Sequence, residues 1–394
     1  MNRLIISRLS KAFAVSSLVW IDFDAAERDR AQRILGLFGE KDSRDELGLG
    51  SLRDSIADLL FPGTSTIQTR LRYMLFIPWL FDQALREAST PRAAADKARG
   101  LEITLIQALR HDPETMGVIG RDAGDSLKRM ASDVYWAGLH IWGLRHATGS
   151  KTELFEAAKR LTADGGAGRI WAAGMPPRPK DLLQTASFTL RAEEADFLVD
   201  RIAASCPDSL LAELARARNA ASCDQIWQHP GVDDFSARSR ALVRHAELFS
   251  HLMEGAGLLY NLMLAERRAH EPWTEDYRAR LDQWSREIDF GAFADWSLDT
   301  LWSETQHEAH AVRPQLQNFV TEWRCRVLDA RGEVADDPGA RAIIETRETR
   351  LKGARSRLRN KSALDRWGGA SGVARLNFRW TVASRHLKDI ADVA

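Results

Sequence analysis

The chain has 394 residues, and its 44% hydrophobic and 28% charged content is typical of a folded globular protein, not of a disordered or membrane-embedded one. Its 55 basic and 55 acidic side chains cancel, which excludes a strong overall field that would steer the protein to nucleic acid or membranes. The three cysteines, Cys206, Cys223 and Cys325, include no CxxC pair, which excludes a disulfide scaffold and a cysteine-based zinc site.

The first residues resemble a secretory leader without completing its pattern. A short apolar run follows Arg3, Arg8 and Lys11, but Ser16 and Ser17 interrupt it, and no small-x-small cleavage site follows. Nowhere does the chain reach the roughly 18 apolar residues that a membrane helix needs. We therefore expect a cytoplasmic protein that makes no contact with a membrane.

Helical periodicity dominates most of the sequence. Apolar residues recur at helical spacing behind Ser132, which we expect to cap that helix. Residues 244–268 carry an apolar stripe in which Gly255 and Gly257 leave room for a neighbouring helix. Alternating strand patterns are short and rare. The sequence therefore predicts a mostly α, multi-helical fold of two to three packed helical subdomains with few or no strands.

Clusters of glycine and proline suggest where these subdomains meet, because such clusters interrupt helices. The two clearest lie between residues 149 and 180 and between residues 333 and 339. The predicted organisation is an N-terminal helical domain (1–150), a Gly/Pro-rich linker or long loop (151–182), a central helical domain (183–335) and a basic C-terminal helical segment (336–394).

The segment from Leu60 to Phe76 predicts a turn followed by a helix, with Thr64 or Ser65 as its cap. The free N–H groups at such a helix start suit an anion. The candidate phosphate contacts here are Thr64, Ser65, Thr66, Arg70 and Arg72. The alternative interpretation is a capped core helix whose arginines pair with the preceding acidic residues Asp42, Asp45 and Glu46.

The C-terminal residues 341–394 hold ten Arg and three Lys against five acidic residues, a net charge of 13 − 5 = +8. Arginines alternate there with Trp367, Phe378 and Trp380, a pattern that suits phosphate contacts together with base stacking. However, the basic residues of 347–361 spread around the helix expected there instead of forming one stripe. A solvated helix, or one paired with acidic parts of this protein or of a partner, stays an alternative. The candidate contacts are Arg355, Arg359, Arg375 and Arg379.

Motifs for catalysis or cofactor binding are missing from the sequence. It contains no GxxxxGK[ST] loop, no GxGxxG after a strand and no GxSxG elbow. His307 and His310 would lie close together on a helix, but no third metal ligand follows at a spacing typical of a metal-binding motif. An exposed polar helix is therefore favoured over a metal site. We predict no cofactor, no metal and no catalytic residue.

A nuclease stays open as an alternative, because two-metal catalysis needs converging carboxylates and sequence does not show convergence. The acidic residues are densest near the N-terminus, although their spacing matches no nuclease signature. They are Asp22, Asp24, Glu40, Asp42, Asp45 and Glu46.

Three segments resemble an uncharacterised bacterial family of similar length: residues 16–24 (SSLVWIDFD), 40–81 (which contains LFPGTSTIQTR) and 132–145 (SDVYWAGLHIWGLR). The likeness continues to residues 375–390, and residues 1–15 are an extension beyond it. The resemblance implies no activity, cofactor or catalytic residue. It implies relatives encoded beside helicases and phospholipase D-like nucleases in mobile or anti-phage gene clusters.

Together these observations predict a non-catalytic helical subunit of a bacterial nucleic-acid-directed system, with anti-phage defence as the expected setting. The expected partners are DNA or RNA, or other proteins of a defence or mobile-element gene cluster, contacted through the basic C-terminal segment. Two alternatives stay open: a metal-dependent phosphodiesterase or nuclease that uses the N-terminal carboxylates, and a pure protein-interaction scaffold.

Overall fold

The computed structural model describes residues 46–112, 115–163 and 170–393. Within these ranges the chain forms fifteen α-helices and several 3-10 turns, and no strand. An isolated antiparallel bridge joins Arg145 to Trp171. The predicted mostly α, multi-helical fold is therefore confirmed.

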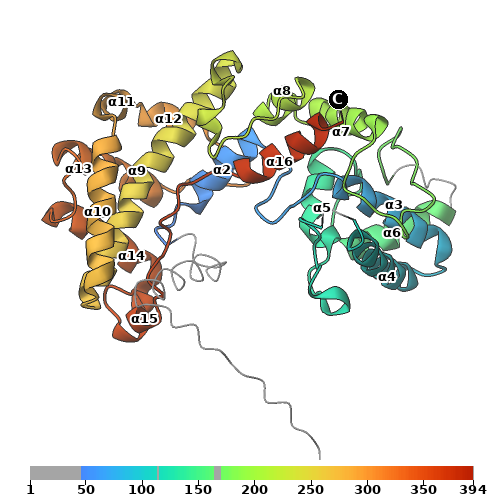
Figure 1. Cartoon of the computed structure of the whole chain (residues 1–394), viewed down its shortest axis with the longest axis horizontal. Helices are drawn as coiled ribbons and strands as arrows, with labels where there is room; N and C mark the ends of the chain where they lie inside the picture. Colours follow the sequence, from blue (N-terminus) through green and yellow to red (C-terminus); the bar gives the residue numbers. More distant parts are fainter. Residues whose placement is uncertain (1–45, 113–114, 164–169, 394) are drawn as a thin grey trace, which may run out of the picture.

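The helices gather into two lobes joined by a narrower bridge (Figure 1). The first lobe contains α3 (Tyr73–Glu87), α4 (Pro91–Leu109), α5 (Ala131–Ile141), α6 (Lys151–Ala163) and α7 (Ala192–Ser205). The second lobe contains α9 (Ala237–Arg267), α10 (Glu271–Glu287), α11 (Phe290–Asp295), α12 (Leu298–Glu304), α13 (Pro314–Asp329), α14 (Pro338–Lys352) and α15 (Lys361–Asp365).

The bridge combines the first and the last helix of the described chain with a short helix from its middle. It contains α2 (Gly50–Leu60), α8 (Leu210–Arg216) and α16 (Trp380–Ala391), which lie between the lobes in Figure 1. The basic C-terminal segment is therefore divided. Its first half adds α14 and α15 to the second lobe, and its last helix fastens the lobes together.

The core of the first lobe follows from the unusually apolar sequence of α3, which buries almost every residue from Tyr73 to Leu85. Aromatic rings from distant segments pack on it. Tyr73 lies 5.2 Å from Tyr135 and 5.4 Å from Phe188, measured between ring centroids. Rings of this size bury much apolar area, so their packing contributes strongly to the stability of this lobe.

The core of the second lobe depends on close approach between α9 and α10, as the glycines of residues 244–268 predict. A Cβ atom added at Gly255 would lie 2.1 Å from the indole of Trp284, so only glycine leaves room for that ring. The indole N–H of Trp284 donates to the carbonyl of His251 across the same contact. The glycine-containing helix is confirmed, and it runs from Ala237, behind the Ser236 cap, to Arg267.

Four local predictions differ from the structure. The predicted linker 151–182 begins with a regular helix, α6. Ser132 lies inside α5 and does not cap it, because its hydroxyl and N–H both donate to the buried carboxylate of Glu102. Burial raises the pKa of Glu102. The N–H of Met130 donates instead to Asp133, which fastens the start of α5.

The helix expected behind Thr64 also starts later, at Tyr73. Tertiary hydrogen bonds hold the intervening residues in turns: the Thr69 N–H donates to the Tyr135 hydroxyl, and the Thr69 hydroxyl donates to the Gly117 carbonyl. The preceding loop therefore offers no helix N-terminus to an anion.

The helix expected across residues 347–361 ends at Lys352, where Gly353 adopts a positive φ of 53° that suits a C-terminal stop. Among the described helices, none is both long and apolar enough to cross a membrane.

Candidate anion-binding surface

The polar residues of the loop before α3 are occupied by that loop itself. The Thr64 hydroxyl donates to the Phe61 carbonyl at 2.6 Å. The Gln68 amide donates to the Gly63 carbonyl and accepts the N–H of Ser65. These bonds occupy the Thr64 hydroxyl and the Ser65 N–H, whereas the buried Ser65 hydroxyl has no hydrogen-bond partner among the described residues.

Arg70 and Arg72 are buried and paired with carboxylates from distant helices. Arg70 lies 2.8 Å from Asp389 of α16, and Arg72 lies 2.8 Å from Glu194 of α7. The side chains of the two arginines are only 9% and 7% exposed. Arg70 therefore connects the first lobe to α16 of the bridge, and Arg72 connects the start of α3 to α7 within the first lobe. Both arginines are paired with carboxylates, as the core-helix alternative expects, and the partners are Asp389 and Glu194.

Arg375 and Arg379 in the C-terminal segment are also paired. Arg375 contacts Glu254 at 2.7 Å and Glu287 at 2.6 Å. Burial lowers the pKa of Arg375, but the two carboxylates outweigh this effect and hold the pKa above its ordinary value. Arg379 pairs with Asp58 of α2, and its side chain is 14% exposed. These contacts neutralise much of the charge of the segment on the acidic body of the same chain.

The aromatic residues of the same segment do not form a stacking platform. Trp367, Phe378 and Trp380 are each at most 1% exposed. The Trp380 indole donates to the Cys223 carbonyl, so its polar edge is satisfied inside the protein. The prediction of base stacking by these three rings is therefore wrong, because they pack in the core.

Three predicted contact residues, Thr66, Arg355 and Arg359, are exposed. Thr66 lies in the loop before α3, and Arg355 lies in the 3-10 turn that follows α14. Within the part of the chain that the structure describes, Arg355 forms no ion pair. Its charge is thus available to solvent or to a partner.

A hollow of about 590 Å³ lies where the end of α9 meets the turn into α15. We call it the basic hollow, because five of its nine lining residues are cationic and one is acidic. It is lined by Arg267, Arg268, Arg357, Leu358, Arg359, Asn360, Lys361, Leu364 and Asp365.

The cations of the basic hollow are only partly neutralised. Arg357 pairs with the buried Glu46 at 2.8 Å. Glu345 lies 3.4 Å from Arg359 and 3.8 Å from Arg267, so one carboxylate is shared between two guanidinium groups. With the lining Asp365, these acids leave a local charge of 5 − 3 = +2.

The exposed cations differ in how firmly they are held. Arg268 donates to the Trp367 carbonyl at 2.7 Å, and its guanidinium lies 5.4 Å from the centroid of the Trp273 ring. The Arg359 side chain is 62% exposed, and the exposed Lys361 forms no ion pair within the described ranges. The hydrogen-bonded Arg268 and the exposed Arg359 and Lys361 can therefore contact the same anion.

The model of a family of unknown function, DUF6361, matches residues 15–394. The chain belongs to this family. The match confirms the family resemblance found in the sequence, and residues 1–14 lie before it. Comparisons with curated proteins and with solved structures found no match.

Sequence reasoning identified Arg359 but missed Arg267 and Arg268. Their only signal is a pair of arginines at the end of a predicted helix, and such pairs are common on surfaces. The contact with residues 357–361 arises from the fold of the second lobe, which brings together segments about ninety positions apart in the sequence.

The acidic cluster proposed for a nuclease falls mostly outside the described residues, namely Asp22, Asp24, Glu40, Asp42 and Asp45. Its last member, Glu46, is 7% exposed and pairs with Lys352 and Arg357. This carboxylate is thus committed to the C-terminal segment.

Proposed function

We propose that this protein is a non-catalytic helical subunit of a bacterial nucleic-acid-directed system, and that it contacts nucleic-acid phosphate through the basic hollow. The observation that carries the proposal is the convergence of five cationic side chains on one surface hollow. Charge paired inside the lobes does not contribute, so the contact is confined to this surface and the neighbouring Arg355.

The chemistry of the hollow favours phosphate over bases. Guanidinium groups bind phosphate oxygens in bidentate fashion, and four of the five lining cations are arginines. The aromatic residues of the segment are buried, so they cannot stack on bases. We therefore expect binding that depends little on nucleotide sequence.

The decisive experiment compares two triple charge reversals by fluorescence anisotropy with labelled single-stranded DNA, RNA and duplex DNA. The test variant is Arg267→Glu/Arg359→Glu/Lys361→Glu in the basic hollow. The control is Arg92→Glu/Lys128→Glu/Arg129→Glu, three exposed cations on and near α4. Both variants change the net charge equally, so only the location of the charge differs.

We expect the hollow variant to lose at least about tenfold in affinity, while the control stays near wild type, since each charge contact contributes on the order of 1 kcal/mol. Equal losses in the two variants would show a non-specific effect of net charge. No binding by the wild-type protein at low salt would contradict the proposal outright.

An acidic segment of a partner protein can offer carboxylates to the same guanidinium groups. A separate experiment is therefore needed to test whether the protein is an interaction scaffold. Co-purification of a neighbouring gene product without nucleic acid, abolished in the hollow variant, would favour that alternative. A role of the protein in anti-phage defence stays a prediction.

A cleavage assay distinguishes the nuclease alternative from the binding subunit. Purified protein would be incubated with plasmid and single-stranded substrates plus Mg²⁺ or Mn²⁺. Cleavage abolished by Asp42→Ala but retained in the hollow variant would favour the enzyme over the binding subunit.

A further inference from the structure

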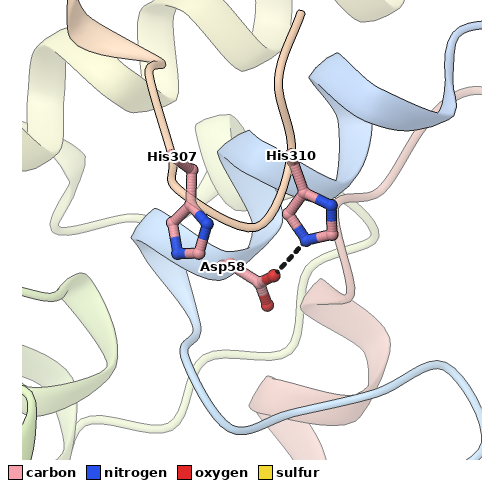
Figure 2. A group of neighbouring side chains, drawn as sticks. All are labelled: Asp58, His307 and His310. Atoms are coloured by element: carbon pink, nitrogen blue, oxygen red, sulfur yellow. Dashed lines mark hydrogen bonds and ion pairs between the residues drawn. The ribbon is translucent and has the colours of Figure 1, made fainter.

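Three potential metal ligands meet between α2 and the loop that joins α12 to α13. Asp58 comes from the last turn of α2, and His307 and His310 come from the loop (Figure 2). The sequence favoured a helix for the two histidines, but residues 306–313 are irregular, with the two imidazole rings stacked at 5.4 Å between centroids. One donor atom from each of the three residues lies within 4.8 Å of the other two.

The donor set fits a particular class of ion. Two imidazole nitrogens and one carboxylate oxygen suit divalent ions such as Zn²⁺ or Co²⁺, whereas Mg²⁺ and Ca²⁺ prefer oxygen ligands throughout. An ion about 2.0–2.1 Å from each donor would hold neighbouring donors roughly 3.3 Å apart in tetrahedral geometry. The Asp58 and His310 atoms are already 2.7 Å apart, so an ion needs a small opening movement and the loss of the proton that His310 Nε2 donates to Asp58, which the other ring nitrogen can carry instead.

The surroundings of Asp58 orient it for this role. Arg379 pairs with one carboxylate oxygen, Oδ1, while His310 donates to the other, Oδ2. Arg379 is itself fixed by its hydrogen bond to the Thr64 carbonyl. Ligating carboxylates commonly have such an outer partner, which directs the remaining oxygen toward the ion. The guanidinium also adds positive charge nearby, so we expect weaker binding than in a site without a neighbouring cation.

Binding of an ion at His307 would break only one weak hydrogen bond. Its Nδ1 accepts a hydrogen bond from the Ala309 N–H at 3.2 Å, at an exposed position. A neutral imidazole has one lone pair, so an ion at either ring nitrogen replaces this hydrogen bond. Water can compensate the released N–H because the loop is at the surface.

The cluster is accessible to an ion from solvent. The side chains of Asp58 and His310 are 18% and 26% exposed, so both are partly accessible to solvent. His310 also lines a separate hollow of about 690 Å³ beside α13 and α14, where water can approach. Three protein ligands and one water complete a tetrahedral coordination shell.

We propose that Asp58, His307 and His310 form a binding site for a divalent transition-metal ion of the zinc class. The ion would fasten the α12–α13 loop to α2, joining segments 252 positions apart. The site is separate from the basic hollow and does not depend on nucleic-acid binding.

The test uses the full-length, tag-free and metal-free protein, titrated with Co²⁺ and followed by visible absorption. We expect a saturable ligand-field band at one Co²⁺ per chain, which Zn²⁺ then displaces. Zn²⁺ should also raise the thermal unfolding midpoint, because an ion that binds only the folded state stabilises it.

The variant His307→Gln/His310→Gln should lose both the band and the thermal shift, while His111→Gln, at an exposed histidine elsewhere, should keep them. Circular dichroism would verify that each variant is folded. A wild-type protein that shows no saturable Co²⁺ binding, or a double variant that binds as well as wild type, would overturn the proposal.

Discussion

Arginines at the junction of the lobes and arginines at the basic hollow have the same chemistry but opposite environments. The Arg70–Asp389 side chains are 9% and 4% exposed, whereas Arg359 beside Glu345 is 62% exposed. Removing one partner of a buried pair leaves an uncompensated charge in a poorly solvated site, while an exposed pair exchanges its partner for water. The first kind of arginine is therefore structural, and the second is available for binding.

This difference shows that a sequence segment with a net positive charge does not necessarily form a positively charged surface. Residues 341–394 carry a net charge of +8, yet Arg375 and Arg379 are neutralised by carboxylates of the body. The segment therefore has mainly a structural role: α14 and α15 pack in the second lobe, and α16 lies in the bridge between the lobes. Arg359 and Lys361 of this segment stay exposed at the basic hollow, close to the end of α9.

The largest expected effect comes from breaking the buried pair. Asp389→Ala leaves Arg70 without its carboxylate and should lower the free energy of unfolding by about 3–5 kcal/mol. The measurement is urea-induced unfolding followed by circular dichroism. The control is Asp82→Ala, which removes the exposed Arg86–Asp82 pair and should cost no more than about 0.5 kcal/mol. Similar losses in the two variants would refute the distinction between them.

A smaller, pH-dependent effect is expected at His386 of α16. Its ring is fully buried between Tyr135 and Trp142, and neither ring nitrogen has a hydrogen-bond partner among the described residues. Burial, with help from Arg385 and Arg70, lowers its pKa to about 3.

The unfolded chain, with a histidine pKa of about 6.5, binds one more proton than the folded protein between the two pKa values. Stability from this residue is therefore present above pH 6.5 and lost as pH falls toward 3, by about 1.4 kcal/mol per pH unit. Unfolding of His386→Phe measured at pH 7, 6 and 5 should show a flatter pH dependence than wild type. Parallel curves would contradict this account.

The smallest effect on stability is expected at the basic hollow. Arg359→Ala removes a long, exposed contact with Glu345 and should change the free energy of unfolding by less than about 1 kcal/mol. The same variant should weaken binding to single-stranded DNA measurably. A large loss of stability would mean that Arg359 is structural, like the arginines at the junction.

Features encoded by local patterns were predictable from the sequence. The apolar stripe and glycines of α9 follow from helical periodicity, and the break before α14 follows from the cluster that contains Pro338. By contrast, the start of α3 depends on hydrogen bonds from Thr69 to Gly117 and Tyr135, which no local pattern encodes.

The candidate sites were less predictable, because each combines distant segments. Arg70 and Asp389 are 319 positions apart, so sequence identified the charges but not their pairing. Likewise, His307 and His310 were recognised as a possible pair of ligands. The third donor, Asp58, becomes visible only when α2 folds against their loop.

The salt dependence of nucleic-acid affinity tests the central claim most directly. Each phosphate neutralised releases counterions, so log K falls with log salt by about 0.7 per contact for single strands. With Arg267, Arg359 and Lys361 as three of the contacts, we predict that their triple replacement by alanine makes the slope shallower by roughly 2 than the wild-type slope. Equal slopes for the two proteins would contradict the assignment of binding to the basic hollow.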